Sequence, residues 1–228
     1  SYYRYVCFRS LMFNLVGLTP HLQPQEINMS GSDVQVAFIT DENAADPDRL
    51  VTAARPNTSA TMAATTFVGG GARNVTVTTA GTSDNAKTNT IVGTDVFGDA
   101  LSEVIVSTGS AEAVAGEKLF LTVTSVTSSA QFAGNITVGS GSLCSKSAGG
   151  GARVRLVGTS IVSAGTAGLV DFYNGTPDTG TIIFKAQTIG TDHATVDNTI
   201  PDEGLLFKDG LSVVYTVATV SLMNIFHS

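Results

Sequence analysis

The chain has 228 residues, of which 43% are hydrophobic, so it can bury a sizeable core in one large domain or two small ones. Charged residues make up only 14%, against roughly 25% in a typical soluble domain. The formal net charge is −7, and no run of Lys and Arg occurs, so the basic stripe that nucleic-acid binding requires is absent from the sequence. This composition is typical of a β-rich protein in close contact with neighbours, or simply of a β-domain with hydroxylated outer faces.

Residues 1–66 predict an irregular N-terminal arm. The opening stretch SYYRYVCFRSLMFNLVGL is rich in aromatic residues, and its apolar part at 11–18 is too short to span a membrane. Aromatic side chains provide a large contact area, so those of the arm are candidate anchors for a partner. They could equally form a hydrophobic edge of the first domain. The candidates are Tyr2, Tyr3, Tyr5, Phe8 and Phe13.

The later part of the arm predicts one strand and one short helix. Apolar and polar residues alternate over 34–39, which indicates a strand. A helix is expected over 47–54, because Asp46 can serve as its N-cap and Pro47 suits the first helical position. Pro56 would end this helix.

Period-two alternation predicts a first β-module over 67–143. The expected strands are short, turn signals such as AGTSDNAK separate them, and no helical period lies between them. These features favour an antiparallel sandwich over a parallel sheet with crossover helices. The strands are expected, in chain order, at 74–79, 89–94, 101–107, 119–126 and 135–139, with 108–118 as a loop.

A glycine- and serine-rich linker at 144–152 is predicted to lead into a second module at 153–228. Its turns include Lys208-Asp209-Gly210, a hairpin signal between two apolar runs. The predicted fold class is therefore all-β, with two small antiparallel β-sandwich or jelly-roll-like modules preceded by an irregular N-terminal arm. Strands in the second module are expected at 153–157, 160–163, 169–173, 180–186, 197–200, 204–207, 211–217 and 222–226.

The segment GGGAR occurs twice, at 69–73 and at 149–153. Neither copy is followed by the Lys-Ser/Thr pair and the helix that a phosphate-binding loop needs. Each copy instead ends a connector at the start of a β-module, where glycine lets the backbone turn freely. We therefore predict hinges at Gly69, Gly70, Gly71, Gly149, Gly150 and Gly151.

No motif for catalysis, a cofactor or a metal is found in the sequence, and the chain is not expected to be an enzyme. Cys7 and Cys144 lack the spacing of a zinc site and are expected to be two unrelated thiols. The acidic clusters lack the glycine and the alternating ligand positions of a calcium loop. Paired carboxylates of the kind that cleave glycosides cannot be recognised from sequence alone. The histidines lie in separate regions, at His21, His193 and His227.

Four segments between residues 72 and 141 carry a family resemblance: TVTTAG, IVGTDVFGDALSEVI, TVTSVT and GNITVGS. Together they resemble a β-domain common in structural proteins of tailed bacteriophages. The C-terminal part is similar to small β-sandwich modules of phage virion proteins, in which a P-x-x-G-x-x-F-x-x-G-L pattern precedes the last hairpin. Here that pattern is formed by Pro201, Gly204, Phe207, Gly210 and Leu211.

The resemblance implies a structural component of a phage virion, assembled in the cytoplasm of the host bacterium. A head decoration (cement) protein, which binds the major capsid protein and stabilises the shell, is the leading hypothesis. Such a protein is expected to be a homo-oligomer, with a trimer favoured, and to bind neither nucleic acid nor membrane. The alternatives are a tail, fibre or adaptor component, or a surface receptor- or glycan-binding module with its site in the loops 174–179 and 188–193.

Overall fold

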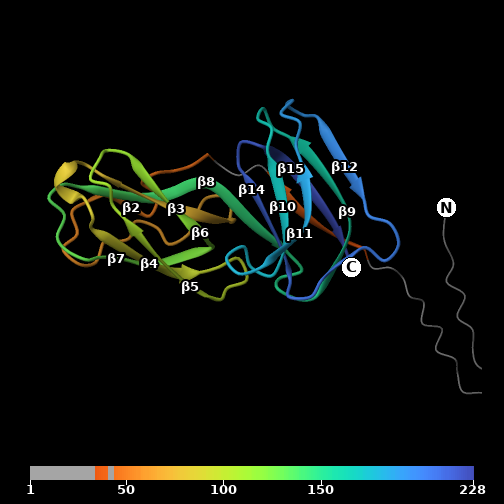
Figure 1. The fold of residues 1–228 in the computed structure, drawn as a ribbon, viewed down its shortest axis with the longest axis horizontal. Coiled ribbons are helices and arrows are strands. Elements are labelled where there is room, and N and C mark those ends of the chain that lie inside the picture. The colour runs from red at the N-terminus through yellow and green to blue at the C-terminus, as the bar shows by residue number, and fades with distance from the viewer. Residues whose placement is uncertain (1–33, 41–43) are drawn as a thin grey trace, which may run out of the picture. The chain divides into compact units, whose positions relative to one another are not determined.

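The computed structural model describes residues 34–40 and 44–228, and the chain from Asp33 onward forms one compact unit (Figure 1). The strands form three sheets in which every pairing is antiparallel, which confirms the predicted all-β class. In the described residues the only helical element is one turn of 3-10 helix, η1 (Thr82–Asp84). Among the described residues, no helix is long and apolar enough to span a membrane.

The sheets are named A, B and C. Sheet A has the order β1 (Gln35–Thr40), β15 (Val220–His227), β9 (Val154–Ser163) and β12 (Thr195–Thr199), and β13 (Leu205–Phe207) also pairs with β9. Sheet B has the order β11 (Thr181–Gln187), β10 (Leu169–Asn174), β14 (Leu211–Thr216), β8 (Ile136–Ala148), β3 (Ala72–Thr79) and β6 (Ala113–Phe120), and β2 (Val51–Ala54) also pairs with β8. Sheet C has the order β5 (Ala100–Val106), β4 (Thr88–Thr94) and β7 (Thr122–Ser128).

Two hydrophobic cores divide the described residues into two sandwiches. In the first sandwich, sheet C packs on the part of sheet B formed by β2, β3, β6 and the first half of β8, and Val77, Ile91 and Phe120 lie in the core. In the second sandwich, sheet A packs on β10, β11, β14 and the end of β8, and Phe172 and Met223 lie in the core. The alternation of apolar and polar residues in the sequence thus corresponds to side chains that point alternately to the core and to solvent.

Strand β8 belongs to both sandwiches. Ile136 and Val138 lie in the first core, whereas Cys144 and Ala148 lie in the second, within one strand of 13 residues. The predicted linker at 144–152 is therefore wrong over its first five residues, which pair with β14. Only the turn that follows Ala148 connects β8 to β9. The two sandwiches are joined by a hydrogen-bonded sheet rather than by a flexible connector (Figure 1).

The small residues of β8 suggested a linker, but they are required because neighbouring segments pack closely against the strand. A Cβ at Gly139 would lie 1.9 Å from the carbonyl oxygen of Asp46, and one at Gly141 would lie 2.5 Å from the Asn74 side chain. Neither approach is possible with a larger residue. Small side chains here indicate crowding, although in sequence they resemble a linker.

A bulge in β8, where residues 141–143 lie opposite Asn74 alone, changes which face of the sheet is covered. The β3–β8 register shifts between Arg73 and Val75, and the Arg73 and Asn74 side chains replace part of the ladder. Arg73 Nη2 donates to the Gly141 carbonyl oxygen at 2.7 Å, and Asn74 Oδ1 accepts from the Leu143 N–H at 3.1 Å. Bulges of this kind bend a strand and increase its twist.

Sheets A and C consequently lie on opposite faces of β8. At the junction, Ala72 and Val214 pack with Val96 and Phe97, which form the turn at the tip of sheet C. Cys144, whose side chain points to the other face of β8, lies in the core beneath sheet A. The shared sheet is therefore covered on one face by sheet C and on the other by sheet A.

The predicted helix at 47–54 is wrong, because this segment pairs with β8 instead. The Leu50 N–H donates to the Val138 carbonyl oxygen at 2.8 Å, and the Ser140 N–H donates to the Asp46 carbonyl oxygen at 2.8 Å. Leu50 and Val51 are fully buried. A partner strand remote in sequence has outweighed the local capping signal.

The described part of the predicted arm is distributed over both sandwiches. The strand expected at 34–39 is confirmed as β1, at the edge of sheet A. Residues 44–66 run along the first sandwich, where the Ala60 N–H donates to the Val126 carbonyl oxygen and the Val123 N–H to the Thr65 carbonyl oxygen. The loop expected at 108–118 is wrong in its second half, which forms most of β6.

Candidate interaction face

The predicted site residues have different outcomes. The aromatic anchors Tyr2, Tyr3, Tyr5, Phe8 and Phe13 lie outside the described residues. The predicted hinge glycines lie in turns, and positive φ angles occur at Gly69 (89°), Gly70 (72°), Gly149 (76°), Gly150 (60°) and Gly151 (83°). These angles lie in the region that favours glycine.

Close packing is a second reason for glycine in these two runs, besides the positive φ angles of the turns. A Cβ at Gly71 would lie 2.7 Å from Cys144 Sγ, and one at Gly151 would lie 3.4 Å from the Phe97 ring. Lys146 Nζ also donates to the Gly69 carbonyl oxygen at 2.7 Å. Both runs thus lie close to the junction of the two sandwiches, and their role as hinges stays a prediction.

The two loops expected to form a glycan site do not meet. In the β10–β11 pair, Asn174 lies opposite Thr181 at one end and Leu169 lies opposite Gln187 at the other. The loop 174–179 leaves from the first end and the loop 188–193 from the second, so they cannot share one site. The first loop is also held to the first sandwich, by an ion pair of 3.0 Å between Asp178 Oδ2 and Lys118 Nζ.

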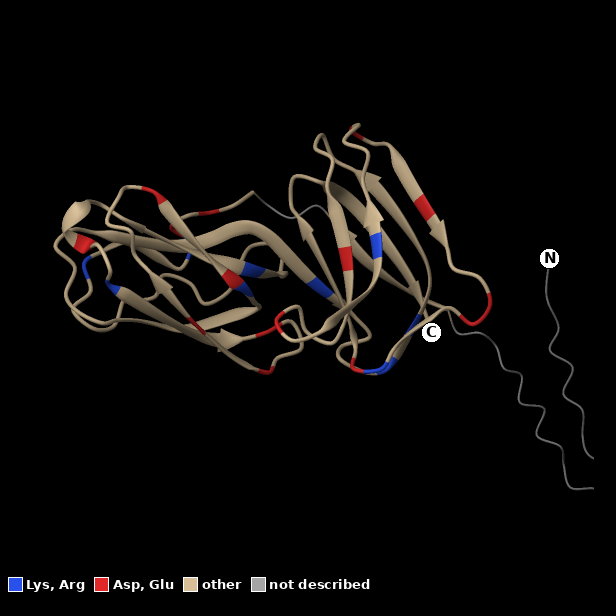
Figure 2. Cartoon of the chain, in the orientation of Figure 1, with Lys and Arg blue, Asp and Glu red and all other residues tan. Residues whose placement is uncertain are grey.

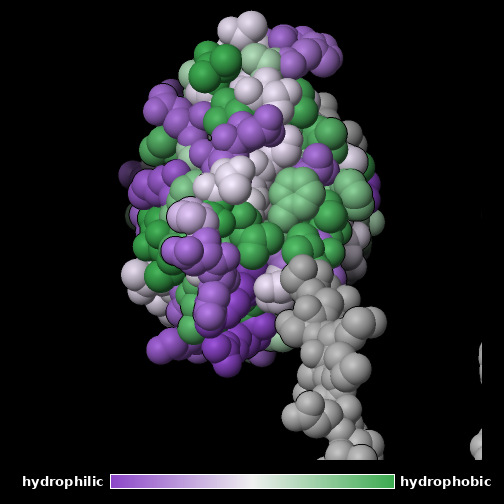
Figure 3. Space-filling model, turned by 90° about the vertical axis from the view of Figure 1, so that its right-hand side faces the viewer, coloured by the Kyte–Doolittle hydropathy of each residue, from purple (hydrophilic) through white to green (hydrophobic). Residues whose placement is uncertain are grey.

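The outer face of sheet A is the surface with the most exposed aromatic side chain of the described residues. Inward residues such as Ala37, Ile39 and Ile225 pack in the second core, so their neighbours in sequence face solvent. Phe38 is 72% exposed, Val36 38% and Val34, just before β1, 46%. Figure 3 shows apolar side chains gathered on this side of the molecule. We use "outer face" for the outward side chains of Val36, Phe38, Ser160, Val162, Asp197, Thr199, Leu222, Asn224 and Phe226 together with Gly158.

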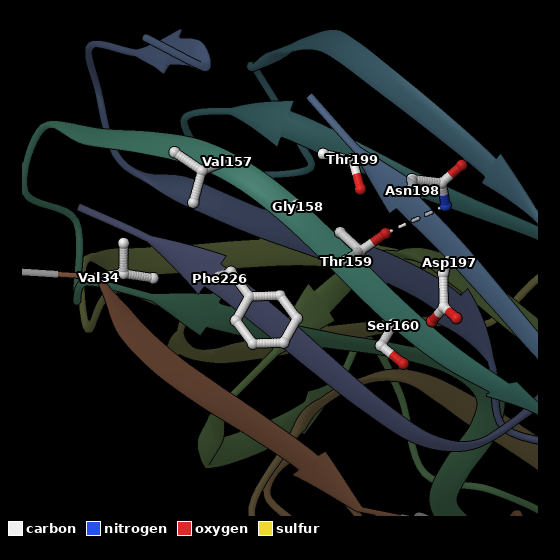
Figure 4. Close-up of a pocket in the computed structure, with 9 residues that line it drawn as sticks. All are labelled: Val34, Val157, Gly158, Thr159, Ser160, Asp197, Asn198, Thr199 and Phe226. Atoms are coloured by element: carbon white, nitrogen blue, oxygen red, sulfur yellow. Dashed lines mark hydrogen bonds between the residues drawn. The ribbon is translucent and has the colours of Figure 1, made fainter. Parts of the chain in front are cut away.

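A row across the four strands explains a groove in this face. Val36 pairs with Phe226, Phe226 with Gly158, and Gly158 with Thr199. Because Gly158 has no side chain, the row is hollow between the Phe226 ring and Thr199. The hollow is an open groove of about 520 Å³, lined by Val34, Val157, Gly158, Thr159, Ser160, Asp197, Asn198, Thr199 and Phe226 (Figure 4).

The groove has an apolar wall and a polar wall. The Phe226 ring and Val34 form the apolar side, whereas β12 provides the polar side with Asp197 and its neighbours (Figure 4). Strand β12 is held in place by a hydrogen bond of 3.1 Å from Asn198 Nδ2 to Thr159 Oγ1. In the adjacent row, Asn224 Oδ1 is inaccessible and accepts no hydrogen bond from any described residue. The polar wall is thus fixed to β9 by a side-chain hydrogen bond as well as by strand pairing.

Charge is almost absent from the apolar side of the outer face. Strands β1 and β15 contain no Lys, Arg, Asp or Glu. Elsewhere, charged residues are scattered over both sandwiches without an extended patch of one sign (Figure 2). In a chain with a net charge of −7, a neutral surface of this kind meets a partner without electrostatic repulsion.

A carboxylate far from this face has a structural role. Asp84 is fully buried, and its oxygens accept from the backbone N–H groups of Ala133 and Gly134 at 2.6 and 3.1 Å and from Lys87 Nζ at 2.7 Å. Burial acts to raise the pKa of Asp84, but these donors and the Lys87 charge outweigh it and hold the pKa below its usual range. The ionised carboxylate thus closes the loop between β7 and β8.

Two other described groups have a pKa shifted by burial, and Cys144 lies in a core. Among the described side chains, no three His, Cys, Asp or Glu residues come together as a metal-binding group. Burial lowers the pKa of His227, which lies at the end of β15, and raises that of Tyr173 on β10, where the Asp171 charge adds to the effect. The Cys144 side chain is buried in the second core.

The sequence pointed to other places for contact, namely the aromatic arm and the loops. The outer face was missed because its residues look like those of any half-buried strand until the pairing places Val36 beside Phe226. The exposed Phe38 in an uncharged strand was the one available signal. Comparisons with protein-family models, with curated proteins and with solved structures gave no significant match to this chain.

Proposed function

We propose that this chain is a structural component of a tailed-phage virion, and specifically a head decoration (cement) protein that binds the major capsid protein. The phage setting comes from the resemblance of residues 72–141 and of the C-terminal turns to virion β-modules. The observation that carries the binding role is the uncharged, apolar side of the outer face, formed by β1 and β15, with Phe38 72% exposed. On this proposal, the outer face is the surface that contacts the shell.

The shared strand supports a mechanical role. A cement protein has to hold neighbouring subunits at fixed positions while the shell is under load. Strand β8 runs through both sandwiches and pairs with β3 in one and β14 in the other. Force applied to one sandwich is therefore passed to the other through backbone hydrogen bonds, without a connector that could extend.

The outer face supports attachment by apolar burial. Burying apolar surface stabilises a contact by about 25 cal/mol per Å², and aromatic side chains at the centre of an interface contribute most. The groove beside Phe226 can receive a side chain from the partner. Modest affinity per copy is sufficient when many copies bind one shell.

The direct experiment is to locate the chain in purified particles by cryo-electron microscopy and to count its copies by quantitative mass spectrometry. We expect a copy number on the scale of the capsid subunits, with sheet A against the shell. A few copies confined to the tail would favour the tail, fibre or adaptor hypothesis. Absence from purified particles would contradict the proposal.

The N-terminal arm needs a deletion that spares the second sandwich. Residues 35–40 are β1 and pair with β15 at all six positions, so a deletion must stop before Val34. If the arm contributes to attachment, removing residues 1–33 lowers particle occupancy while the melting temperature stays unchanged. Unchanged occupancy would remove the arm, and with it the aromatic anchors, from the proposal.

Surface glycan binding is a second candidate with one observation in its favour. The groove places the Phe226 ring opposite the Asp197 carboxylate, so that it offers an apolar surface and a hydrogen-bond acceptor within one site (Figure 4). A glycan array probed with the intact chain tests this candidate. Binding that is lost on Asp197→Asn would support it, and no binding on the array would exclude those sugars.

A further inference from the structure

The outer edge of β1 is a strand edge without the usual protection. Strand β1 (Gln35–Thr40) ends the order of sheet A, and none of the described residues pairs with its second edge. Its pairing with β15 covers all six positions without a register shift. An edge that is unpaired within the described residues presents N–H and C=O groups, which form a template for another strand.

Other strand edges in the molecule carry protective features. Strands β5, β6, β11 and β12 include the charged residues Glu103, Glu117, Lys185 and Asp197, and charge on an edge opposes pairing with another chain. The edge of β7 is bridged by the segment that precedes β3. In contrast, β1 has the sequence QVAFIT, with no charge, no proline and no bulge.

The side chains of β1 match a second copy of the same strand. Val36 and Phe38 project from one face and are 38% and 72% exposed, and no ionised group on β1 or on β15 would repel an identical surface. Two copies of a chain with a net charge of −7 repel each other at most orientations. Strand β1 itself adds no charge to that repulsion, although Asp33, Asp41 and Glu42 flank it in the sequence.

We infer that β1 pairs antiparallel with β1 of a second copy, so that two A sheets become one continuous sheet across a two-fold axis. An antiparallel pairing of identical strands is self-complementary, as a two-fold interface requires. The inference concerns the free protein and does not depend on the virion setting.

Alternation selects one register. Core-facing residues have to lie opposite core-facing residues, because a slip by one position would turn each apolar side chain to the wrong face. Two registers satisfy this and pair five residues of each β1, but the one centred on Phe38 leaves Val36 opposite Thr40. We take the one centred on Ala37, which pairs the exposed apolar side chains with each other. It places Val36 of each copy opposite Phe38 of the other. A two-fold contact gives a dimer or an even-numbered assembly in place of the trimer implied by the family resemblance.

Sedimentation equilibrium of the full chain at about 100 μM, a concentration that populates even micromolar complexes, tests the contact. We expect a dimer for the unmodified chain and a monomer for Phe38→Lys, because the substitution puts a charge at the edge. Thr199→Lys is the matched control: it places the same charge on an exposed position of the same face, but on the opposite edge strand. This control should remain a dimer.

Mixing two variants tests the register. Phe38→Lys combined with Val36→Glu should restore a heterodimer, since each altered residue then faces the other across the axis. Phe38→Lys combined with Phe38→Glu should not, because position 38 faces position 36. A monomeric unmodified chain, a dimer that survives Phe38→Lys, or better rescue by the second mixture than by the first would each overturn the inference.

Folding of the variants is checked by circular dichroism. Because Phe38 is 72% exposed, its replacement should leave the thermal transition near that of the unmodified chain, and a monomer with this transition supports the inference. Failure of the dimer inference can be distinguished from failure of the virion proposal. A monomer that is present in particles would overturn only the β1 contact, whereas a dimer that is absent from particles would overturn only the virion proposal.

Discussion

Sheets A and C each leave one face to solvent, and the two faces are built differently. On sheet C, the exposed valines pair with hydroxylated residues: Val104 lies opposite Thr90, and Val106 lies opposite Thr88. On sheet A, Val36 lies opposite Phe226, so apolar side chains meet each other. Cross-strand pairs set the character of a sheet face. Scattered valines need no partner to explain them, whereas a joined aromatic and aliphatic surface does.

The two sandwiches differ in their surfaces, but neither is independent of the other. Strand β8 contributes to both cores, so neither sandwich has a complete sheet without it. We therefore expect one cooperative unfolding transition for the described unit. The variants below either disturb the shared strand β8 or change one sandwich at a time.

The largest expected effect is that of Gly139→Ala in β8. The added Cβ would lie 1.9 Å from the Asp46 carbonyl oxygen, a backbone atom that cannot move without displacing the segment before β2. We expect a loss of about 3 kcal/mol or more in the free energy of unfolding, measured by chemical denaturation. The loss should appear in both sandwiches at once.

Gly81→Ala is the control for that variant. Gly81 has nothing within 4 Å of an added Cβ, and its φ of −168° is open to any residue. Its free energy of unfolding should change by less than about 0.5 kcal/mol, as is usual for surface substitutions. Two separate transitions in Gly139→Ala, with the second sandwich unaffected, would contradict the shared-strand account.

A smaller effect is expected for Asp84→Asn in the first sandwich. The substitution removes the charge that Lys87 and two backbone N–H groups stabilise, and we expect a loss of about 1–3 kcal/mol. Asp178→Asn, which breaks the half-exposed pair with Lys118, should cost less than about 1 kcal/mol. Equal costs for the two variants would argue against the buried role of Asp84.

The buried Asp84 carboxylate should also make the stability depend on pH. The pKa of Asp84 is lower in the folded chain than in the unfolded chain, so its contribution is fully present above the unfolded value. Stability is lost as the pH falls below about 4, where the unfolded carboxyl begins to take up a proton. Urea denaturation between pH 7 and pH 3 should show this loss, and Asp84→Asn should flatten it.

The smallest expected effect belongs to His227 in the second sandwich. Burial lowers the pKa of His227 in the folded chain, so the unfolded chain binds the proton first as the pH falls. Stability is therefore full above about pH 6.5 and decreases as the pH falls from there through the folded pKa. His227→Gln should remove this slope between pH 7 and pH 5 without affecting the steeper loss due to Asp84, and an unchanged slope would exclude His227 as its source.

Strand positions were largely predictable because alternation reports directly on burial. The strand expected at 89–94 is β4 (Thr88–Thr94), and the one expected at 180–186 is β11 (Thr181–Gln187). The turn before β14 was also foreseen, and Gly210 there has a φ of 93°. These features depend on neighbours in the sequence, so a single sequence contains them.

Features that depend on distant partners were not predictable. The segment 47–54 has a good helix-capping signal, but it pairs with β8, which lies more than eighty residues further along the chain. The glycines of β8 look like a linker because their crowding comes from Asp46 and Asn74. The outer face shares this origin, since only the pairing of β1 with β15 joins the N-terminal strand to Phe226.

The most direct test of the attachment surface compares one substitution on each of the two outer faces. Shells that lack this protein are incubated with Phe226→Asp or with Val104→Asp, and the bound protein is counted after sedimentation of the particles. Our account predicts that Phe226→Asp, on sheet A, binds at least about tenfold more weakly, as expected for an aromatic anchor, and that Val104→Asp, on sheet C, binds like the unmodified chain. Full binding of Phe226→Asp, or equal loss in both variants, would contradict it.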